Sequence, residues 1–280
     1  MIGAIIGDIV GSPYEHGFLN KRTVPNKQFP LFNEKSRFTD DSVLTCATAQ
    51  ALLLPSKTPY PRRFASLYKS WALTNPDRGY GSRFKEWLAK PKMVSLDSYA
   101  NGCMMRCSPI AFLCEDRSDA LTKALQSIQY THNSPEAARG VQSIVDAIHM
   151  AWCGHTKEDI KTHVQIQYGH MLNVPLDELR KKASRDIRCN VSAPQALTCF
   201  MLADGYVDAI RNAVYIDGDT DTTAAIAGAL AEAYYGTDSI PSFMIDEMKK
   251  RITPEMKGVV SQFYEKLGKM YPSSTYRFQP

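Results

Sequence analysis

The sequence predicts an all-α protein that folds as one compact domain over residues 1–280. Two observations carry this prediction. Apolar residues recur at helical spacing through most of the chain, and segments that alternate apolar and polar residues, as a half-buried strand would, are scarce. An apolar content of 44% in 280 residues is normal for a globular protein with a sizeable core. No repeat, low-complexity tract or interdomain linker divides the chain.

The first expected helix carries a stripe of glycines. Gly3, Gly7 and Gly11 recur every four residues, which places them on one face of a helix. A face without side chains allows close packing, so we expect this helix to be central. It should end at Ser12, before Pro13, and residues 21–38 should form a loop, because they hold two prolines among scattered polar residues.

Helical patterns account for most of the remaining chain. A helix from about Asp41 to Leu54 should stop before Pro55. Further patterns, in chain order, cover roughly residues 61–74, 82–89, 101–114, 117–130, 134–153, 156–169, 176–186, 193–202, 204–213, 222–235, 241–251 and 254–270. Residues 213–216 are the best candidate for a short strand.

Two acidic segments, each at the start of an expected helix, carry the chemistry. Asp217–Thr223 places three aspartates and three threonines within seven residues, and Thr39–Ser42 is a second cluster of oxygen-bearing side chains. Helix capping alone would explain the second cluster, because Thr, Ser and Asp are favoured at helix starts. It does not explain the first, because one helix needs only one cap.

The spacing of Asp217, Asp219 and Asp221 is not that of an EF-hand. The sixth loop position would be Thr222 instead of glycine, and the twelfth would be Gly228 instead of glutamate. The segment therefore needs ligands from elsewhere, and the Thr39–Ser42 cluster is the obvious source. Oxygen ligands select Mg²⁺ or Mn²⁺, with Ca²⁺ as a third option. Four or more carboxylates favour two ions over one.

Charge and cysteine usage exclude several classes of protein. A net charge of +4, with no run of Lys or Arg longer than three, predicts no dedicated nucleic-acid-binding patch. No segment is apolar enough to span a membrane, and residues 1–10 lack the features of a secretory signal. Seven cysteines without a Cys-x-x-Cys pair predict free thiols in a cytoplasmic protein. Cys103, Cys107 and Cys114 should be buried on one helix face.

Five segments together resemble the ADP-ribosylglycohydrolase family, which includes the dinitrogenase-reductase-activating glycohydrolase and the vertebrate ADP-ribosylhydrolases. The segments run nearly end to end and are residues 3–15 (GAIIGDIVGSPYE), 39–42 (TDDS), 101–109 (NGCMMRCSP), 131–132 (TH) and 218–228 (GDTDTTAAIAG). The resemblance implies a compact all-α domain of that family's type. It also implies a pair of Mg²⁺ or Mn²⁺ ions in a cleft that holds ADP-ribose. The expected reaction is hydrolysis at C1″ of the distal ribose.

The resemblance also assigns roles to individual residues. It implies six metal ligands, namely Thr39, Asp40, Asp41, Asp219, Asp221 and Thr222. One of two carboxylates, that of Glu15 or that of Asp41, would orient the attacking water and take its proton. Five residues would bind the substrate, namely Ser98, Tyr99, Asn101, Gly102 and His132. A structural role for His132, and pairing of Arg106 with a core carboxylate, remain alternatives.

The chain departs from the family pattern at three positions. Asp217 replaces a glycine and is not counted as a ligand, while Cys103 and Met104 reshape the pocket wall. None of these changes removes a ligand, so activity is expected. Two alternatives stay open, namely another dinuclear metal hydrolase acting on nucleotides or phosphodiesters, and a non-catalytic ADP-ribose-binding protein. We expect a monomer acting on an ADP-ribosylated protein, small molecule or nucleic acid, with the leaving group undetermined.

Overall fold

The computed structural model describes residues 1–15, 24, 26–182 and 186–271. Within these ranges it holds fourteen α-helices, two 3₁₀ turns and no strand, and backbone bridges join only Asp97 to His132 and Ala100 to Arg188. The α-helices are α1 (Ile2–Gly11), α2 (Asp40–Leu53), α3 (Tyr60–Thr74), α4 (Ser82–Ala89), α5 (Ser108–Leu113), α6 (Arg117–Ile128), α7 (Pro135–Trp152), α8 (Lys157–Tyr168), α9 (Leu176–Lys181), α10 (Cys189–Met201), α11 (Tyr206–Tyr215), α12 (Thr220–Tyr235), α13 (Ser242–Arg251) and α14 (Pro254–Met270). The predicted all-α fold is confirmed.

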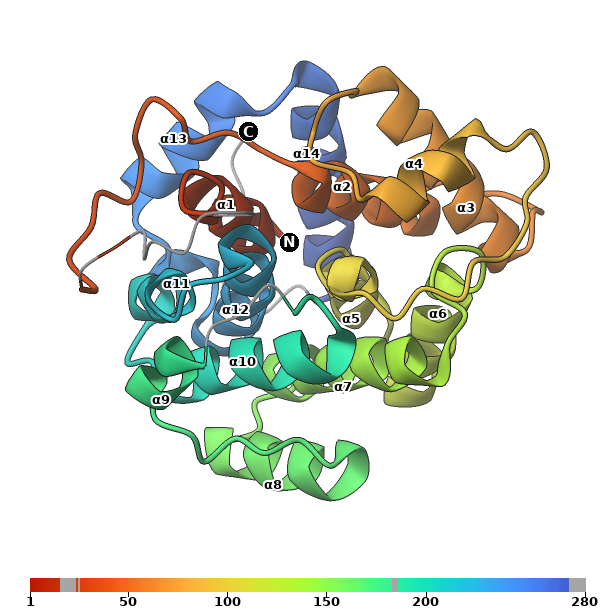
Figure 1. Ribbon diagram of the computed structural model, residues 1–280. Coiled ribbons are helices and arrows are strands. Elements are labelled where there is room, and N and C mark those ends of the chain that lie inside the picture. The colour runs from red at the N-terminus through yellow and green to blue at the C-terminus, as the bar shows by residue number, and fades with distance from the viewer. Residues whose placement is uncertain (16–23, 25, 183–185, 272–280) are drawn as a thin grey trace.

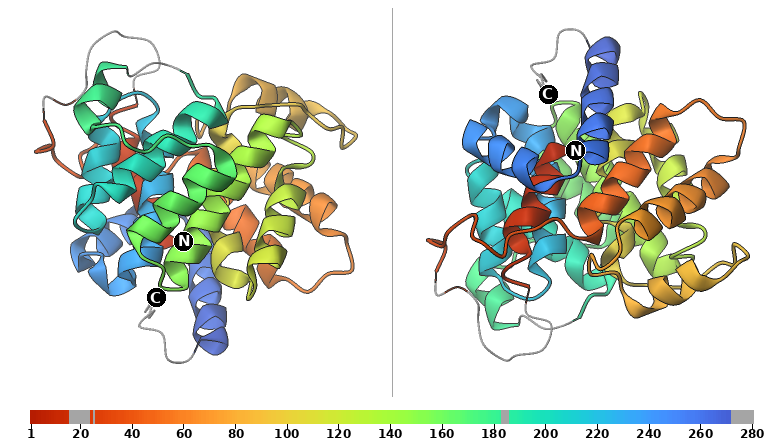
Figure 2. Two further views of the ribbon diagram at one scale, coloured as in Figure 1. Left: turned by 90° about the horizontal axis from the view of Figure 1, so that it is seen from below. Right: turned by 90° about the horizontal axis from the view of Figure 1, so that it is seen from above.

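The helices surround a central pair, α1 and α12 (Figure 1). Helices α2, α3 and α4 lie to one side of this pair, and α7 and α10 run beneath it. Helix α14 packs on α2 and projects at one edge of the bundle (Figure 2). Buried apolar side chains from nearly every helix form one core cluster. None of the described helices is both long and apolar enough to cross a membrane.

The glycine stripe makes the contact between α1 and α12 closer than ordinary side chains allow. A Cβ atom on Gly7 would lie 2.1 Å from the carbonyl oxygen of Ala224, and one on Gly3 would lie 2.4 Å from that of Gly228. Gly228 faces Gly3 in the same way, at 2.2 Å from its carbonyl oxygen. Every residue of α1 is buried. The prediction of a central, closely packed first helix is therefore confirmed.

Three sequence-based assignments of secondary structure were wrong or imprecise. The strand candidate at residues 213–216 is wrong, because α11 continues through Tyr215 and buries its apolar residues at helical spacing. The helix expected over residues 101–114 is broken into a 3₁₀ turn, Asn101–Cys103, and α5, which has a proline in its first turn. Helix α10 begins at Cys189, earlier than expected, so Pro194 lies inside it.

The predictions of free thiols and of three buried cysteines are confirmed, but the expectation that these three share one helix face is wrong, because the helix is broken. All seven thiols are free, and Cys103, Cys107 and Cys114 are buried. They belong to the 3₁₀ turn, to the residue before α5 and to the end of α5.

We predict that Gly7→Ala destabilises the protein strongly, by about 1–3 kcal/mol or more, because the new methyl group would overlap backbone atoms of α12 that cannot move aside. The matched control is Gly258→Ala in α14, where a Cβ atom meets nothing within 4 Å. There the same change should stabilise the helix by about 0.5–1 kcal/mol. Urea unfolding of both variants measures the two effects, and equal effects would contradict the packing argument.

Candidate metal and substrate site

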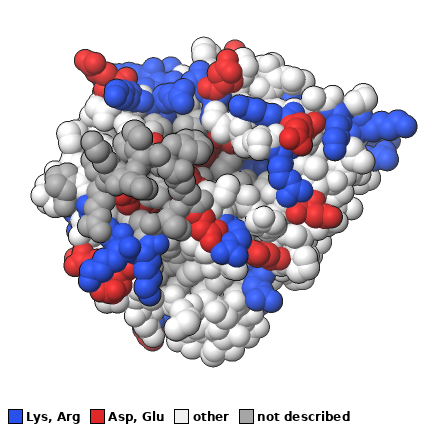
Figure 3. All heavy atoms as spheres, in the orientation of Figure 1, with Lys and Arg blue, Asp and Glu red and all other residues white. Residues whose placement is uncertain are grey.

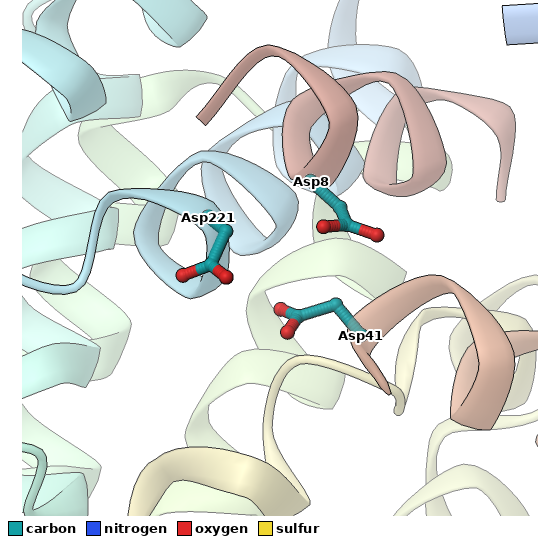
Figure 4. Close-up of side chains that lie close together, drawn as sticks. All are labelled: Asp8, Asp41 and Asp221. Carbon is teal, nitrogen blue, oxygen red and sulfur yellow. The ribbon is translucent and has the colours of Figure 1, made fainter. Parts of the chain in front are cut away.

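Three helices bring three carboxylates to one point. Asp8 comes from α1, Asp41 from the first turn of α2 and Asp221 from the first turn of α12 (Figure 4). One carboxylate oxygen from each lies within 4.8 Å of the others. A second group with the same spacing contains Glu15, Asp219 and Asp221. Asp221 therefore belongs to both groups, which is the arrangement expected of a carboxylate between two neighbouring cations.

Asp8 holds the start of α2 in place. Its Oδ2 accepts hydrogen bonds from the backbone N–H of Thr39 at 2.9 Å and of Ser42 at 3.1 Å, and also from the Ser42 hydroxyl. Its Oδ1 accepts from the Thr39 hydroxyl at 2.7 Å. Thr39 in turn caps α2, because its Oγ1 accepts from the backbone N–H of Asp41. The Thr39–Ser42 segment therefore caps α2 and also lies close to the other acidic segment, which contains Asp221.

Sequence reasoning missed Asp8 as part of the site. The sequence did contain an indication of its role, because Asp8 is a charged residue in the middle of an otherwise apolar, glycine-striped helix. Such a residue is costly to bury unless it has partners. The position of those partners could not be read from the sequence, because they depend on how α1 lies against α2.

A cavity of about 280 Å³ opens beside the carboxylates. Ten of the sequence-predicted site residues line it, namely Glu15, Asp40, Asp41, Ser98, Asn101, Gly102, His132, Asp219, Asp221 and Thr222. Two predicted residues do not: Thr39 is buried behind the cavity in its capping role, and Tyr99 is 50% exposed. A larger, open hollow of about 790 Å³, lined in part by Lys157 and Tyr215, includes none of the predicted site residues.

Asp40, Asp217 and Asp219 differ in their positions. Asp40 lines the cavity but belongs to neither three-carboxylate group. Asp219 accepts a hydrogen bond from Asn101 Nδ2 at 2.5 Å, which ties the acidic end of the cavity to the predicted substrate segment. Asp217 adopts a left-handed backbone conformation (φ 71°) and lies outside the cavity lining and both groups.

Arg106 and His132 form a buried polar wall of the cavity. Arg106 is 1% exposed, donates to Thr131 Oγ1 at 2.7 Å and lies over the ring of Tyr68. The expected alternative, a carboxylate partner for Arg106, is wrong for the part of the chain that the structure describes. Burial and the charges of Arg106 and Arg83 hold the pKa of His132 well below its usual range, so this imidazole is neutral.

The carboxylates of the site resist ionisation together when no cation is present. Burial raises the pKa of Asp8 to about 6. Burial, followed by the negative charge of Asp8, raises the pKa of Asp40 to about 8 and that of Asp41 well above its usual range. The pKa of Asp221 is likewise raised well above its usual range, by burial first and Asp41 second. Positive charge between these groups would remove the repulsion.

A divalent cation fits this donor set. Asp41 Oδ1 is buried and has no hydrogen-bond partner among the described residues, which is costly for a carboxylate oxygen. All the donors are hard oxygens, which suit Mg²⁺, Mn²⁺ or Ca²⁺. The groups around Asp8 and around Glu15 provide two adjacent places for such ions, with Asp221 common to both.

We predict that the metal-free protein loses thermal stability as pH rises from 5 to 8.5. Asp8 and Asp40 have folded-state pKa values of about 6 and about 8, above the ordinary 3.8. The stability that their protonation provides is complete below pH 3.8 and disappears as pH rises through 6 and then 8. Saturating Mg²⁺ or Mn²⁺ should therefore raise the melting temperature more at pH 8 than at pH 5.5. Asp40→Asn should remove the part of the pH dependence that lies near pH 8. A melting temperature of the unmodified protein that rises with pH in the presence of chelator would contradict the prediction.

Comparisons with known proteins identify the family of the chain. The sequence profile of a family described as ADP-ribosylglycohydrolase matches residues 1–273. Similar curated proteins include the human ADP-ribosylhydrolase ARH3, 27% identical over 86% of this chain and 85% of the relative. They also include the ADP-ribosylarginine hydrolase Tri1 of Pseudomonas putida strain GB-1, 23% identical over 89% of this chain and 72% of the relative.

Two further matches extend the comparison. The ADP-ribosyl-[dinitrogen reductase] glycohydrolase of Rhodospirillum rubrum is 24% identical over 56% of this chain and 53% of the relative. A solved structure entitled ADP-ribosylglycohydrolase-related protein complex has the same fold, with a TM-score of 0.70, 20% identity and 95% of each chain covered. The family profile spans nearly the whole chain, and the chain is therefore an enzyme of the ADP-ribosylglycohydrolase family.

Proposed function

We propose that this protein hydrolyses the bond at C1″ of the distal ribose in ADP-ribosyl conjugates and releases ADP-ribose, with two divalent cations, Mg²⁺ or Mn²⁺, as cofactors. The observation that carries the proposal is the pair of carboxylate groups that share Asp221 at one end of a cavity. Family membership and the activities that the relatives' names describe support the same reaction class. ADP-ribosylated proteins are the substrates that these names favour.

The carboxylates divide between two ion positions. Asp41 and Asp221 would hold one ion, with Asp8 orienting the start of α2, and Glu15, Asp219 and Asp221 would hold the other. Asp40 and Thr222, two further predicted ligands, line the same space, whereas Thr39, the sixth, caps α2. When bound, divalent ions supply Lewis acidity, which lowers the pKa of water and positions ribose hydroxyl groups.

Glu15 is the carboxylate best placed to handle the proton of the attacking water. It lines the cavity, its side chain is exposed, and its pKa is raised by partial burial first and by the charge of Asp219 second. A raised pKa brings a carboxylate closer to the value at which a general base works well near neutral pH. Asp41 is fully buried, so it is better suited to holding an ion than to exchanging protons with water.

The carboxylates at the acidic end carry more negative charge than two divalent cations would neutralise, and the excess would favour the charge that develops during cleavage. Departure of the leaving group from C1″ makes the ribose ring oxocarbenium-like and positive. Preorganised negative groups stabilise such a state at little cost in reorganisation. Asn101, which bridges Asp219 and Ser192 through its side-chain amide, fixes the position of the nearby substrate segment relative to this acidic end.

Gly102 leaves room for the substrate. A Cβ atom there would lie 3.5 Å from His132 Nε2, an ordinary contact, so the fold does not require glycine at this position. The absent side chain instead keeps the cavity open between the substrate segment and His132.

The rival functions differ in what they need from this cavity. A dinuclear phosphodiesterase or nucleotidase usually recruits histidine ligands, and no histidine belongs to either carboxylate group in the described part of the chain. A non-catalytic ADP-ribose-binding protein would not need an exposed Glu15 beside two such groups. The leaving group remains open, since the relatives' names differ on it.

The function is tested with a panel of ADP-ribose conjugates of arginine, serine, a nucleobase and an acetyl ester. Purified protein with Mg²⁺ or Mn²⁺ should release free ADP-ribose from at least one conjugate, and chelator should abolish release. Phosphodiester substrates serve as the comparison. Cleavage of these substrates alone would assign the protein to the rival class of hydrolase.

We predict that variants of three neighbouring aspartates lose different numbers of ions. Asp221→Asn should lose both, because this carboxylate belongs to both groups, and Asp219→Asn should lose mainly one. Asp217→Asn, in the same loop but outside the cavity lining, is the matched control and should keep both. Metal analysis after dialysis measures occupancy, and turnover should fall by about 10² or more in the first two variants. Equal occupancy in Asp221→Asn and Asp217→Asn would contradict the two-ion arrangement.

A further inference from the structure

The cavity has a basic end as well as an acidic one. Arg106 and His132 line it, and each is more than nine-tenths buried. Arg106 Nε and His132 Nδ1 have no hydrogen-bond partner among the described residues. Unpartnered polar atoms in a buried wall are costly, so this end of the cavity is polar and leaves part of its hydrogen-bonding capacity unused.

The start of helix α4 borders the same cavity. Gly79, Gly81 and Ser82 all line it. No side chain caps α4, and its first turn holds no acidic residue. The first N–H groups of the helix are therefore free for a ligand, and together with the helix dipole they favour an anion.

Arg83 adds a cation at this point. Its side chain is exposed yet lines the cavity, and it has neither a carboxylate nor a hydrogen-bond partner among the described residues. Burial first, the charge of Arg106 second and that of Arg83 third lower the pKa of the nearby His132 imidazole. Arg106 is fixed by Tyr68 and Thr131, whereas Arg83 is free to move onto a ligand.

The predicted substrate segment gives a reason for such a cation. Residues 98–102, which include four of the five predicted substrate-binding residues, contain no charged side chain. In the proposed function the cations at the acidic end are taken up by the carboxylates and the ribose hydroxyl groups, so they do not pair with the phosphate oxygens. A doubly negative pyrophosphate in this cavity therefore needs positive charge from another element, and the start of α4 supplies it.

We propose that Arg83, together with the free N–H groups at the start of α4, binds the phosphate oxygens of the substrate and selects phosphate-bearing ribosyl conjugates over uncharged nucleosides. This inference rests on the proposed function and deepens it, because it names a specificity-determining residue of the same site. Arg83 does not touch C1″ in this arrangement, so its contribution is to substrate affinity and not to the chemical step.

The test is the binding of ADP-ribose and of adenosine to Arg83→Gln in the presence of Mg²⁺, measured by calorimetry. Arg83→Gln should weaken ADP-ribose binding about tenfold, the scale of a charge-assisted hydrogen bond at a partly exposed site, and Arg83→Glu should weaken it further. Adenosine binding should change less than twofold. Lys85→Gln, in the same helix but outside the cavity lining, is the matched control and should leave both ligands unaffected.

Kinetics with an active conjugate provide the second readout. Arg83→Gln should raise KM while leaving kcat within about twofold, because the interaction is present in substrate and transition state alike. Arg83→Lys should recover part of the affinity. Unchanged ADP-ribose binding in Arg83→Gln, an equal loss for adenosine, or a fall in kcat without a change in KM would each overturn the inference.

Binding and turnover separate this inference from the proposed function. A protein that binds ADP-ribose through Arg83 but releases it from no conjugate contradicts the glycohydrolase function alone. A protein that is active but binds ADP-ribose equally well without Arg83 contradicts the inference alone.

Discussion

The close contact between α1 and α12 is the constraint on which the site depends. Side-chain-free faces let two helix backbones approach until carbonyl oxygens lie where a Cβ atom would otherwise be. Such a contact is favourable because dispersion attraction accumulates over closely packed backbone atoms. It also brings Asp8, in the middle of one helix, beside Asp221, in the first turn of the other.

Asp8 also fixes the position of α2 relative to α1. Its carboxylate receives four hydrogen bonds from Thr39 and Ser42, so the N-terminus of α2 is fixed by a side chain from another helix. Hydrogen bonds to a buried carboxylate are among the stronger ones in proteins. The position of Asp41 therefore follows from the packing of α1 and not from the loop before α2.

Without cations, the packing of the helices holds carboxylates close together although burial and repulsion disfavour their ionised forms. Packing brings Asp8, Asp41 and Asp221 together. Burial raises the pKa of all three, and repulsion from neighbouring carboxylates raises those of Asp41 and Asp221 further. Such a site can be either protonated or occupied by cations at neutral pH. Figure 3 shows that acidic and basic side chains are interspersed on the face it presents, whereas Asp8, Asp41 and Asp221 are buried.

Sequence alone predicted the helical class, the glycine-striped central helix and most helix positions, because each depends on local periodicity. It also predicted that two distant acidic segments meet, since neither has enough local ligands. It could not predict Asp8, the break after Asn101–Cys103 or the surroundings of Arg106, because each depends on which helices are neighbours. The strand candidate at residues 213–216 failed because a short apolar run does not distinguish a strand from the end of a buried helix.

The glycine stripe has a consequence for how the site tolerates change. Because the glycines are four residues apart, α1 can pack this closely on α12 only in certain registers. The next such register lies about 6 Å along the helix axis. A slip of one residue would turn the stripe away by about 100° and press side chains into α12. The spacing of the carboxylates is thus set by the register of two helices. Insertions in the surrounding loops can alter the rim of the cavity while this spacing stays constant.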